Sequence, residues 1–123
     1  MPRAGTGAAT LEDRMNRRAQ VLQNGRLSGV LEQTPDGTYR FTYEPVYLAN
    51  PVAKAVSLTL PMRQEPFESP QLFPFFSGLL AEGNLKEMQC RLYKIDPNDD
   101  FTRLLKTTRD DVIGAVTLEE LSE

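Results

Sequence analysis

Two pairs of adjacent carboxylates, Asp99-Asp100 and Asp110-Asp111, are the side chains best suited to metal or acid–base chemistry. Paired carboxylates can bind Mg²⁺ or exchange a proton with a substrate. Asp99-Asp100, however, comes just before an apolar periodic segment, where aspartate caps a helix and interacts favourably with its dipole. Asp110-Asp111 lies between a predicted helix and a predicted strand, where aspartate organises turns. We interpret both pairs as structural and predict no metal site.

Nucleophilic catalysis has little support among the other side chains. The chain has no histidine, so its serines lack the base of an ordinary Ser-His triad. Its single cysteine, Cys90, can form neither an intramolecular disulfide nor a zinc site of the usual spacing. We interpret Cys90 as a buried, inert thiol within a helix. The sequence therefore predicts no catalytic residue and no cofactor.

Two further patterns could bind nucleotides or nucleic acid, and a structural interpretation is favoured for both. Residues 24–29, NGRLSG, contain two glycines but lie in a predicted hairpin and lack the lysine of a P-loop. Tyr39, Phe41 and Tyr43 could stack bases, as sheet aromatics do in some RNA-binding modules. Few basic residues are interleaved with them, and aromatics are common in strands, so a packed sheet face is favoured.

Phe67 is the most unusual aromatic residue, because it lies in a polar segment bounded by prolines at both ends. A rigid loop that presents an aromatic side chain is a plausible anchor in the pocket of a partner. The equally weighted alternative is that Phe67 folds back as a lid on a small core. If the segment contacts a partner, the residues we expect to do so are Met62, Arg63, Glu65, Phe67 and Glu68.

Composition narrows the remaining function classes. The net charge is −3, and the 14 basic residues are scattered along the chain. A basic stripe for phosphate contacts is therefore not evident, and direct nucleic-acid binding is not expected. No apolar stretch has the length of a membrane span, and the start of the sequence lacks the apolar centre of a signal peptide. Together with the single cysteine, these features predict a cytoplasmic protein.

The first half of the chain has the pattern of a β-meander. Residues 18–43 are predicted to form three antiparallel strands, with hairpin turns at Asn24-Gly25 and Thr34-Pro35-Asp36-Gly37. The alternation from Tyr39 to Tyr43 indicates one aromatic and one polar face. The segments expected next are a helical turn at residues 46–48, a fourth strand at residues 57–60 ended by Pro61, and a loop at residues 62–69.

The second half is mainly helical. A first helix is predicted from Pro74 to Glu82-Gly83, and a second from Asn84, with Glu87 completing a capping box. The apolar stripe of the second helix is Leu85, Met88, Leu92 and Ile95. A third helix, capped by Asp99 or Asp100, carries Phe101, Leu104 and Leu105, and residues 112–118 are predicted to close the fold as a strand.

This order of elements predicts an α+β fold, in which about three helices pack against one face of a small antiparallel sheet. The sheet would consist of the N-terminal meander and the later strands. The predicted domain spans residues 17–118. We expect a flexible tail at residues 1–16, which are rich in Gly and Ala, and an acidic tail at residues 119–123.

Five segments together resemble the N-terminal subdomain of the HipA family, the serine/threonine kinase toxins of bacterial toxin–antitoxin systems. The resemblance covers about residues 17–118, and its joint pattern is more specific than any one piece. The segments are NGRLSGVLEQ (24–33), YRFTYEPVYLAN (39–50), SLTLPMR (57–63), LFPFFSGLLAEGN (72–84) and FTRLLKTTRDDVIGAVTL (101–118).

The resemblance carries implications for function and partners. In the family, this subdomain leads into a kinase core that binds ATP, so resemblance to the subdomain implies no kinase activity. It points to the split arrangement of a HipS-like antitoxin, a HipT kinase and a DNA-binding HipB protein. The implied role is an antitoxin that docks onto a HipA-like kinase. The alternative is a non-inhibitory subunit that bridges the kinase to a HipB-like repressor. A DNA-binding transcription factor is disfavoured by the acidic pI and the lack of a helix-turn-helix pattern.

Overall fold

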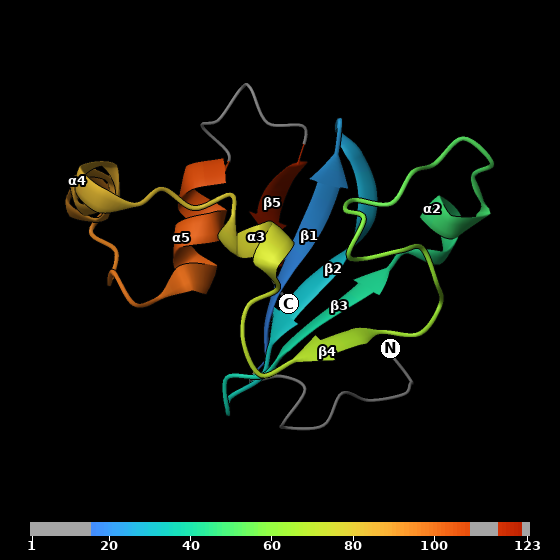
Figure 1. Cartoon of the computed structure of the whole chain (residues 1–123), viewed down its shortest axis with the longest axis horizontal. Coiled ribbons are helices and arrows are strands. Elements are labelled where there is room, and N and C mark those ends of the chain that lie inside the picture. Colours follow the sequence, from blue (N-terminus) through green and yellow to red (C-terminus); the bar gives the residue numbers. More distant parts are fainter. Residues whose placement is uncertain (1–15, 109–115, 122–123) are drawn as a thin grey trace.

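A five-stranded antiparallel sheet forms the centre of the protein in a computed structural model that describes residues 16–108 and 116–121 (Figure 1). The strand order is β4-β3-β2-β1-β5. The strands are β1 (Arg17–Gln23), β2 (Arg26–Gln33), β3 (Tyr39–Tyr43), β4 (Phe67–Ser69) and β5 (Val116–Glu120), and the helices are α2 (Pro45–Ala49), α3 (Pro74–Ser77), α4 (Gly83–Tyr93) and α5 (Asp100–Thr107). The predicted α+β class is confirmed.

The predicted meander is confirmed, and local turn chemistry explains it. Asn24 and Gly25 both have positive φ, 53° and 80°, as the two central residues of a tight hairpin turn must. The second turn contains Gly37 at φ 92°, and Asp36 accepts a hydrogen bond from the Thr38 backbone N–H at 3.1 Å. These turns set the register in which β1, β2 and β3 pair.

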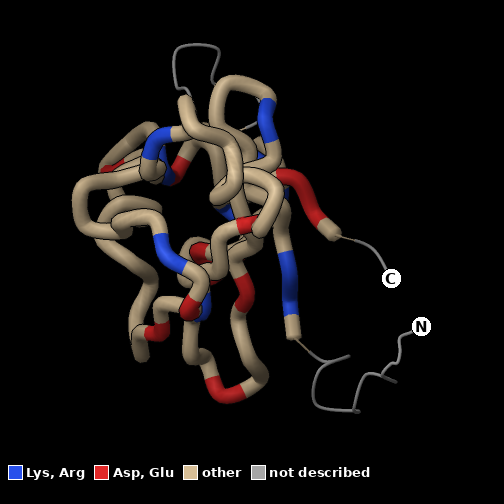
Figure 2. Tube along the Cα trace, turned by 90° about the vertical axis from the view of Figure 1, so that its right-hand side faces the viewer, with Lys and Arg blue, Asp and Glu red and all other residues tan. Residues whose placement is uncertain are grey.

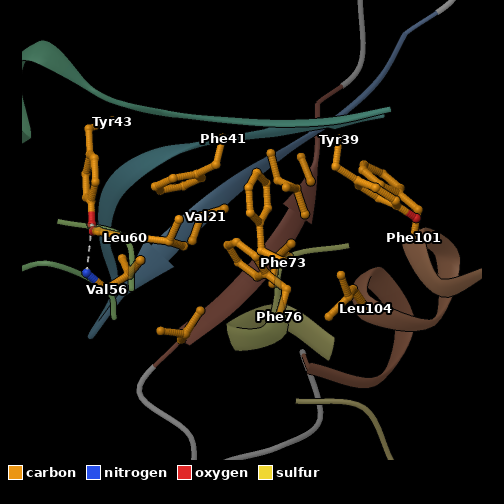
Figure 3. Packing of buried hydrophobic residues seen from close by; sticks show 14 of the residues in the cluster. Val21, Tyr39, Phe41, Tyr43, Val56, Leu60, Phe73, Phe76, Phe101 and Leu104 are labelled. Atoms are coloured by element: carbon orange, nitrogen blue, oxygen red, sulfur yellow. Dashed lines mark hydrogen bonds between the residues drawn. The ribbon is translucent and has the colours of Figure 1, made fainter. Parts of the chain in front are cut away.

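The core lies on one face of the sheet, between the sheet and helices α3 and α5 (Figure 3). Tyr39, Phe41 and Tyr43 point into it and are buried, so the packed-face interpretation of these aromatics is confirmed. Phe41 meets Phe76 of α3 with ring centroids 5.7 Å apart. Leu104 of α5 is also fully buried in this cluster. Aromatic burial from both the sheet and the helices therefore holds the two layers together.

The predicted fourth strand was wrong in its position. Residues 57–60 form a tight turn, in which the Leu60 N–H donates to the Ser57 carbonyl at 3.0 Å. The strand next to β3 is instead β4, within the segment expected to be a loop. Phe67 and Phe41 are partners in this pairing. A three-residue strand with a proline on each side has too little alternation to be recognised from local pattern.

The predicted helices exist, but two of their details were wrong. The first helix is a single turn, α3, which ends at Ser77 with Gly78 as its C-cap, rather than at residues 82–83. The second, α4, begins one residue early at Gly83 and has Glu82 rather than Asn84 at its N-cap, so the predicted capping box of Asn84 and Glu87 does not form. The predicted α2 turn is confirmed between Pro45 and Ala49.

The closing strand is confirmed where the structure describes it. β5 begins at Val116, while residues 112–115 and the pair Asp110-Asp111 lie outside the described residues. β5 pairs with β1 and continues to Glu120, two residues beyond the domain end expected at Leu118. The first two residues of the predicted acidic tail therefore belong to the sheet.

Asp99 caps α5, as its position before an apolar periodic segment predicts. Its carboxylate accepts the Thr102 backbone N–H at 3.2 Å. Arg17 of β1 donates to the same oxygen at 2.7 Å, and its guanidinium lies 4.7 Å from the centre of the Phe101 ring. Asp100 pairs with Arg103 at 3.1 Å. The first acidic pair is therefore structural, and it ties α5 to the first strand.

We predict that Asp99 makes stability depend on pH on the acidic side. Partial burial opposes its ionisation, but hydrogen bonds from Thr102 and Arg17 outweigh this effect and lower its pKa below the ordinary 3.8. A carboxylate with a lower pKa in the folded state stabilises the fold above its unfolded-state pKa, and this contribution is lost as pH falls through the folded-state pKa. The free energy of unfolding, measured in urea, should therefore decrease below about pH 4.

The Asp99→Asn variant tests this prediction, because asparagine still caps a helix but carries no charge. Its free energy of unfolding should decrease less than that of the wild type over the same acidic range. Asp96→Asn, at an exposed aspartate in the preceding turn, serves as the control and should keep the wild-type decrease. An unchanged acidic decrease in Asp99→Asn would contradict the assignment.

Candidate partner-binding surface

The segment predicted to contact a partner turns two of its five side chains toward the core. Phe67 is half-buried in β4 and packs against the core cluster, and Met62 does the same from the preceding loop. This position matches the alternative in which Phe67 is a lid on the core. The structure thus packs Met62 and Phe67 against the same core cluster and leaves the charged members of the segment exposed.

Arg63 makes three contacts within its own loop. Its guanidinium carbon lies 3.7 Å from the centre of the Phe67 ring, a cation–π geometry. It also donates to the carbonyl oxygens of Glu65 and Pro66, each at 3.1 Å. The Arg63 and Glu65 side chains are exposed. The loop therefore presents one cation and one carboxylate to solvent, and two of its backbone carbonyls accept hydrogen bonds from Arg63.

Glu68 faces the opposite way, on the outer face of the sheet. Its carboxylate lies 3.2 Å from Arg40, Arg40 lies 3.5 Å from Glu32, and Glu32 lies 3.7 Å from Arg18. The four charges form a ladder across β4, β3, β2 and β1, whose register places them side by side. Because the nearby Arg40 guanidinium balances the charge of Glu68, this carboxylate attracts a cationic partner less strongly than the carboxylate of Glu65 does.

The turn at residues 57–60 presents a leucine that sequence pattern did not single out. Leu58 is 100% exposed at its tip. The Tyr43 hydroxyl accepts the Val56 N–H at 3.0 Å and donates to the Leu60 carbonyl, so one buried side chain fixes both ends of the turn (Figure 3). Burial raises the pKa of Tyr43, which keeps this hydroxyl protonated and able to donate.

Among the described residues, the groups that sequence singled out for possible chemistry do not form a metal site or expose a thiol. Cys90 is buried, as predicted. Across residues 16–108 and 116–121, no three acidic or cysteine side chains gather closely enough to hold a metal ion.

Acidic and basic positions are interspersed along the trace rather than grouped by sign (Figure 2). Within the same described residues, no helix has both the length and the apolar character needed to cross a bilayer.

The apolar stripe of α4 is largely exposed. Leu85, Met88 and Leu92 are 48%, 56% and 70% exposed, whereas Ile95, just beyond the helix, is buried. The sequence did predict the stripe, by its helical spacing. What the spacing could not indicate is that the stripe faces away from the body of the protein, because periodicity identifies a face but not what it packs against.

Comparison with known proteins gives one consistent match. Residues 19–119 match the family described as HipA N-terminal domain. A Haemophilus influenzae protein described as uncharacterized is 36% identical over 104 residues, which are 85% of this chain and 92% of that protein. The putative kinase Y4mE of Sinorhizobium fredii is 34% identical over 98 residues, 80% of this chain but 23% of the kinase.

A solved structure supports the same match. The N-terminal domain of HipA toxin superimposes with a TM-score of 0.64 at 29% identity, covering 87% of this chain and 94% of that domain. The agreement therefore extends from sequence to fold over most of both chains.

Proposed function

Because this chain belongs to the HipA N-terminal domain family, we propose that it is a non-catalytic antitoxin that docks onto a HipA-related serine/threonine kinase and neutralises it. The observation that carries the proposal is the pair of relatives in which the domain occurs. The matched domain makes up only 23% of a putative kinase, whereas it makes up nearly all of a short Haemophilus protein. A domain found in both arrangements is suited to bind a kinase as a separate chain.

Docking alone is a sufficient mechanism for neutralisation. A bound protein shifts the kinase toward whichever conformation it prefers, or it blocks access to the active site, and neither effect needs chemistry from the antitoxin. The extent of inhibition then follows mass action. A free antitoxin concentration about 100 times Kd leaves roughly 1% of the kinase unbound. Antitoxin abundance and affinity together would set the threshold for toxicity.

The loop that contains Arg63 and Glu65 is our proposed polar contact with the kinase. Both side chains are exposed, and Arg63 keeps the backbone ordered through its bonds to the loop carbonyls. An ordered charged loop loses little conformational entropy on binding. The carboxylate of Glu65 could pair with cations of a phosphate-binding site. Met62, Phe67 and Glu68 would then support the loop from the core and from the sheet.

The proposal predicts that co-expression of this chain restores growth of cells that express a HipA-related kinase. In purified form, the two proteins should elute as one complex from a size-exclusion column. Transfer of labelled phosphate by the kinase should fall to near background at excess antitoxin. Glu65→Lys should weaken the complex, by about tenfold if the charge guides association, and its thermal unfolding should match that of the wild type.

Two results would contradict the proposal in different ways. If the wild-type chain neither binds the kinase nor restores growth, the antitoxin role is wrong. If a complex forms and the kinase keeps its activity, the chain is a structural or bridging subunit. Adding a HipB-like repressor to that complex would then show whether all three proteins assemble.

A further inference from the structure

Helix α4 packs against the protein through Cys90 and two long polar side chains rather than through its leucines. Cys90 is buried, and Lys86 and Gln89 are half-buried, so these side chains line the inner face of the helix. Leu85, Met88 and Leu92 follow the i, i+3, i+7 spacing of a single stripe and are exposed on the other side. A surface helix normally turns such a stripe inward. The orientation of α4 is therefore the reverse of that expected for a helix with no further partner.

The orientation is held by contacts at both ends of the helix. Arg103 of α5, only 5% exposed, donates to the Ala81 carbonyl at 2.6 Å and fixes the turn that leads into α4. At the other end, Lys94 adopts a left-handed conformation, and the Ile95 N–H donates to the Cys90 carbonyl at 2.8 Å. Ile95 itself is buried. The exposed stripe is thus displayed on a helix anchored at each terminus.

A hollow with both polar and apolar lining residues lies beside the stripe. It has a volume of about 310 Å³ and is shared between the α3–α4 turn, α4 and the end of α5. Leu85 belongs to both the stripe and the hollow, so the two are continuous. The lining residues are Leu79, Leu80, Ala81, Leu85, Gln89, Thr107 and Thr108. Figure 1 shows that α4 lies beyond α5 at one end of the molecule, where a large partner can approach it.

We infer that this α4 face, formed by Leu85, Met88 and Leu92, is a docking surface for the HipA-related kinase; the inference rests on the function proposed above. The chain architecture of a relative supports the choice of occupant. In the putative kinase Y4mE, the matched region is only 23% of the chain, so the same unit there is continuous with a much larger body. An apolar interface centre is what such a unit needs to pack against that body.

A second copy of this chain fits the surface less well. A helix of 11 residues is about 16 Å long. If its apolar stripe packed against the same stripe of a second copy, the contact would bury only a small surface area. Stable protein interfaces bury about 1,200–2,000 Å² in total. A kinase can contact the stripe, the hollow and neighbouring surface at once, which a narrow helix-to-helix contact cannot.

The test uses isothermal titration calorimetry to measure binding of the full chain to the full-length HipA-related kinase with which it co-elutes, made inactive by substitution of a catalytic residue. The double variant Met88→Glu/Leu92→Glu should weaken binding at least about 30-fold, because buried apolar anchors dominate such interfaces. The matched control is Val46→Glu/Val52→Glu, which adds the same charge at two apolar residues that are 80% and 71% exposed and lie outside both proposed contact surfaces. Its affinity should stay within about threefold of the wild type.

Each other outcome is decisive. Wild-type affinity in Met88→Glu/Leu92→Glu, or equal losses in both double variants, overturns the inference and leaves the antitoxin proposal intact. Failure of the wild type to bind removes the antitoxin proposal itself. Self-association that Met88→Glu/Leu92→Glu abolishes, with kinase binding unchanged, would assign the face to a second copy and overturn the inference. Leu92→Gln, a milder change at a 70% exposed residue, replaces the double variant if that variant unfolds.

Discussion

Replacing Phe76 with alanine should lower the free energy of unfolding by about 3–5 kcal/mol, the usual cost of removing a buried phenyl ring. Phe76 is fully buried and is the one buried residue of α3, a single helical turn. Its ring lies 5.7 Å from that of Phe41 and 6.3 Å from that of Phe73. Because the turn is too short to stabilise itself, its position depends on this side chain.

The matched control is the neighbouring residue of the same type. Phe75 is only partly buried, although it also packs on the core, so Phe75→Ala should cost about 1–2 kcal/mol. A domain of this size has a total stability of about 5–15 kcal/mol, so Phe76→Ala should also lower Tm strongly. Urea and thermal unfolding would measure both variants. Equal losses at the two positions would show that burial in α3 does not determine the stability of the core.

Replacing Gly29 with alanine should cost at least about 3 kcal/mol, the upper end of what overpacking usually costs. A Cβ atom at this position would lie 2.5 Å from the Thr42 carbonyl oxygen and 2.8 Å from two atoms of the Phe41 ring. The Phe41 ring therefore occupies the space that any side chain on β2 would need here. The Thr42 oxygen belongs to the backbone of β3, so relief requires β2 and β3 to separate.

Gly78→Ala is the control for Gly29→Ala. Gly78 has φ −68°, and the nearest atom to a Cβ there is the Pro74 carbonyl oxygen at 3.3 Å, so alanine should change the free energy of unfolding by less than about 1 kcal/mol. Adding Phe41→Leu to Gly29→Ala should recover only part of the loss from the clash, since the contact with the Thr42 oxygen remains. A Gly29→Ala variant as stable as the wild type would contradict the packing described for β2 and β3.

The parts of the fold that sequence pattern predicted are those that local chemistry determines. The hairpin at Asn24-Gly25 follows from two residues that tolerate positive φ, and the α5 cap follows from Asp99 before an apolar segment. The position of β4 depends instead on the pairing of Phe67 with Phe41, and these two residues are far apart in sequence. No local pattern of residues 57–69 encodes that pairing, so the fourth strand was expected at residues 57–60.

The candidate surface was predicted less completely than the fold, for a related reason. Sequence identified the charged loop through Phe67 and the stripe of α4 through its spacing. It could not indicate that Arg63 lies over the Phe67 ring or that Met88 and Leu92 face solvent. Both facts concern which neighbour each side chain meets. Nothing in the sequence indicated that Leu58 is exposed at the tip of a turn, because a leucine between two polar residues has the alternating pattern of a strand.

The pairing of β1 with β5 has a consequence for biosynthesis. These strands come from opposite ends of the described chain, and Leu121 donates its N–H to the Arg18 carbonyl at 2.9 Å. During synthesis on the ribosome, β1 emerges long before β5. Until β5 is made, the edge of β1 that pairs with β5 has no partner strand. Val116 and Leu118 join the core only at that last step. The nascent domain therefore completes its sheet late, and until then it is exposed to the premature strand pairing that leads to aggregation.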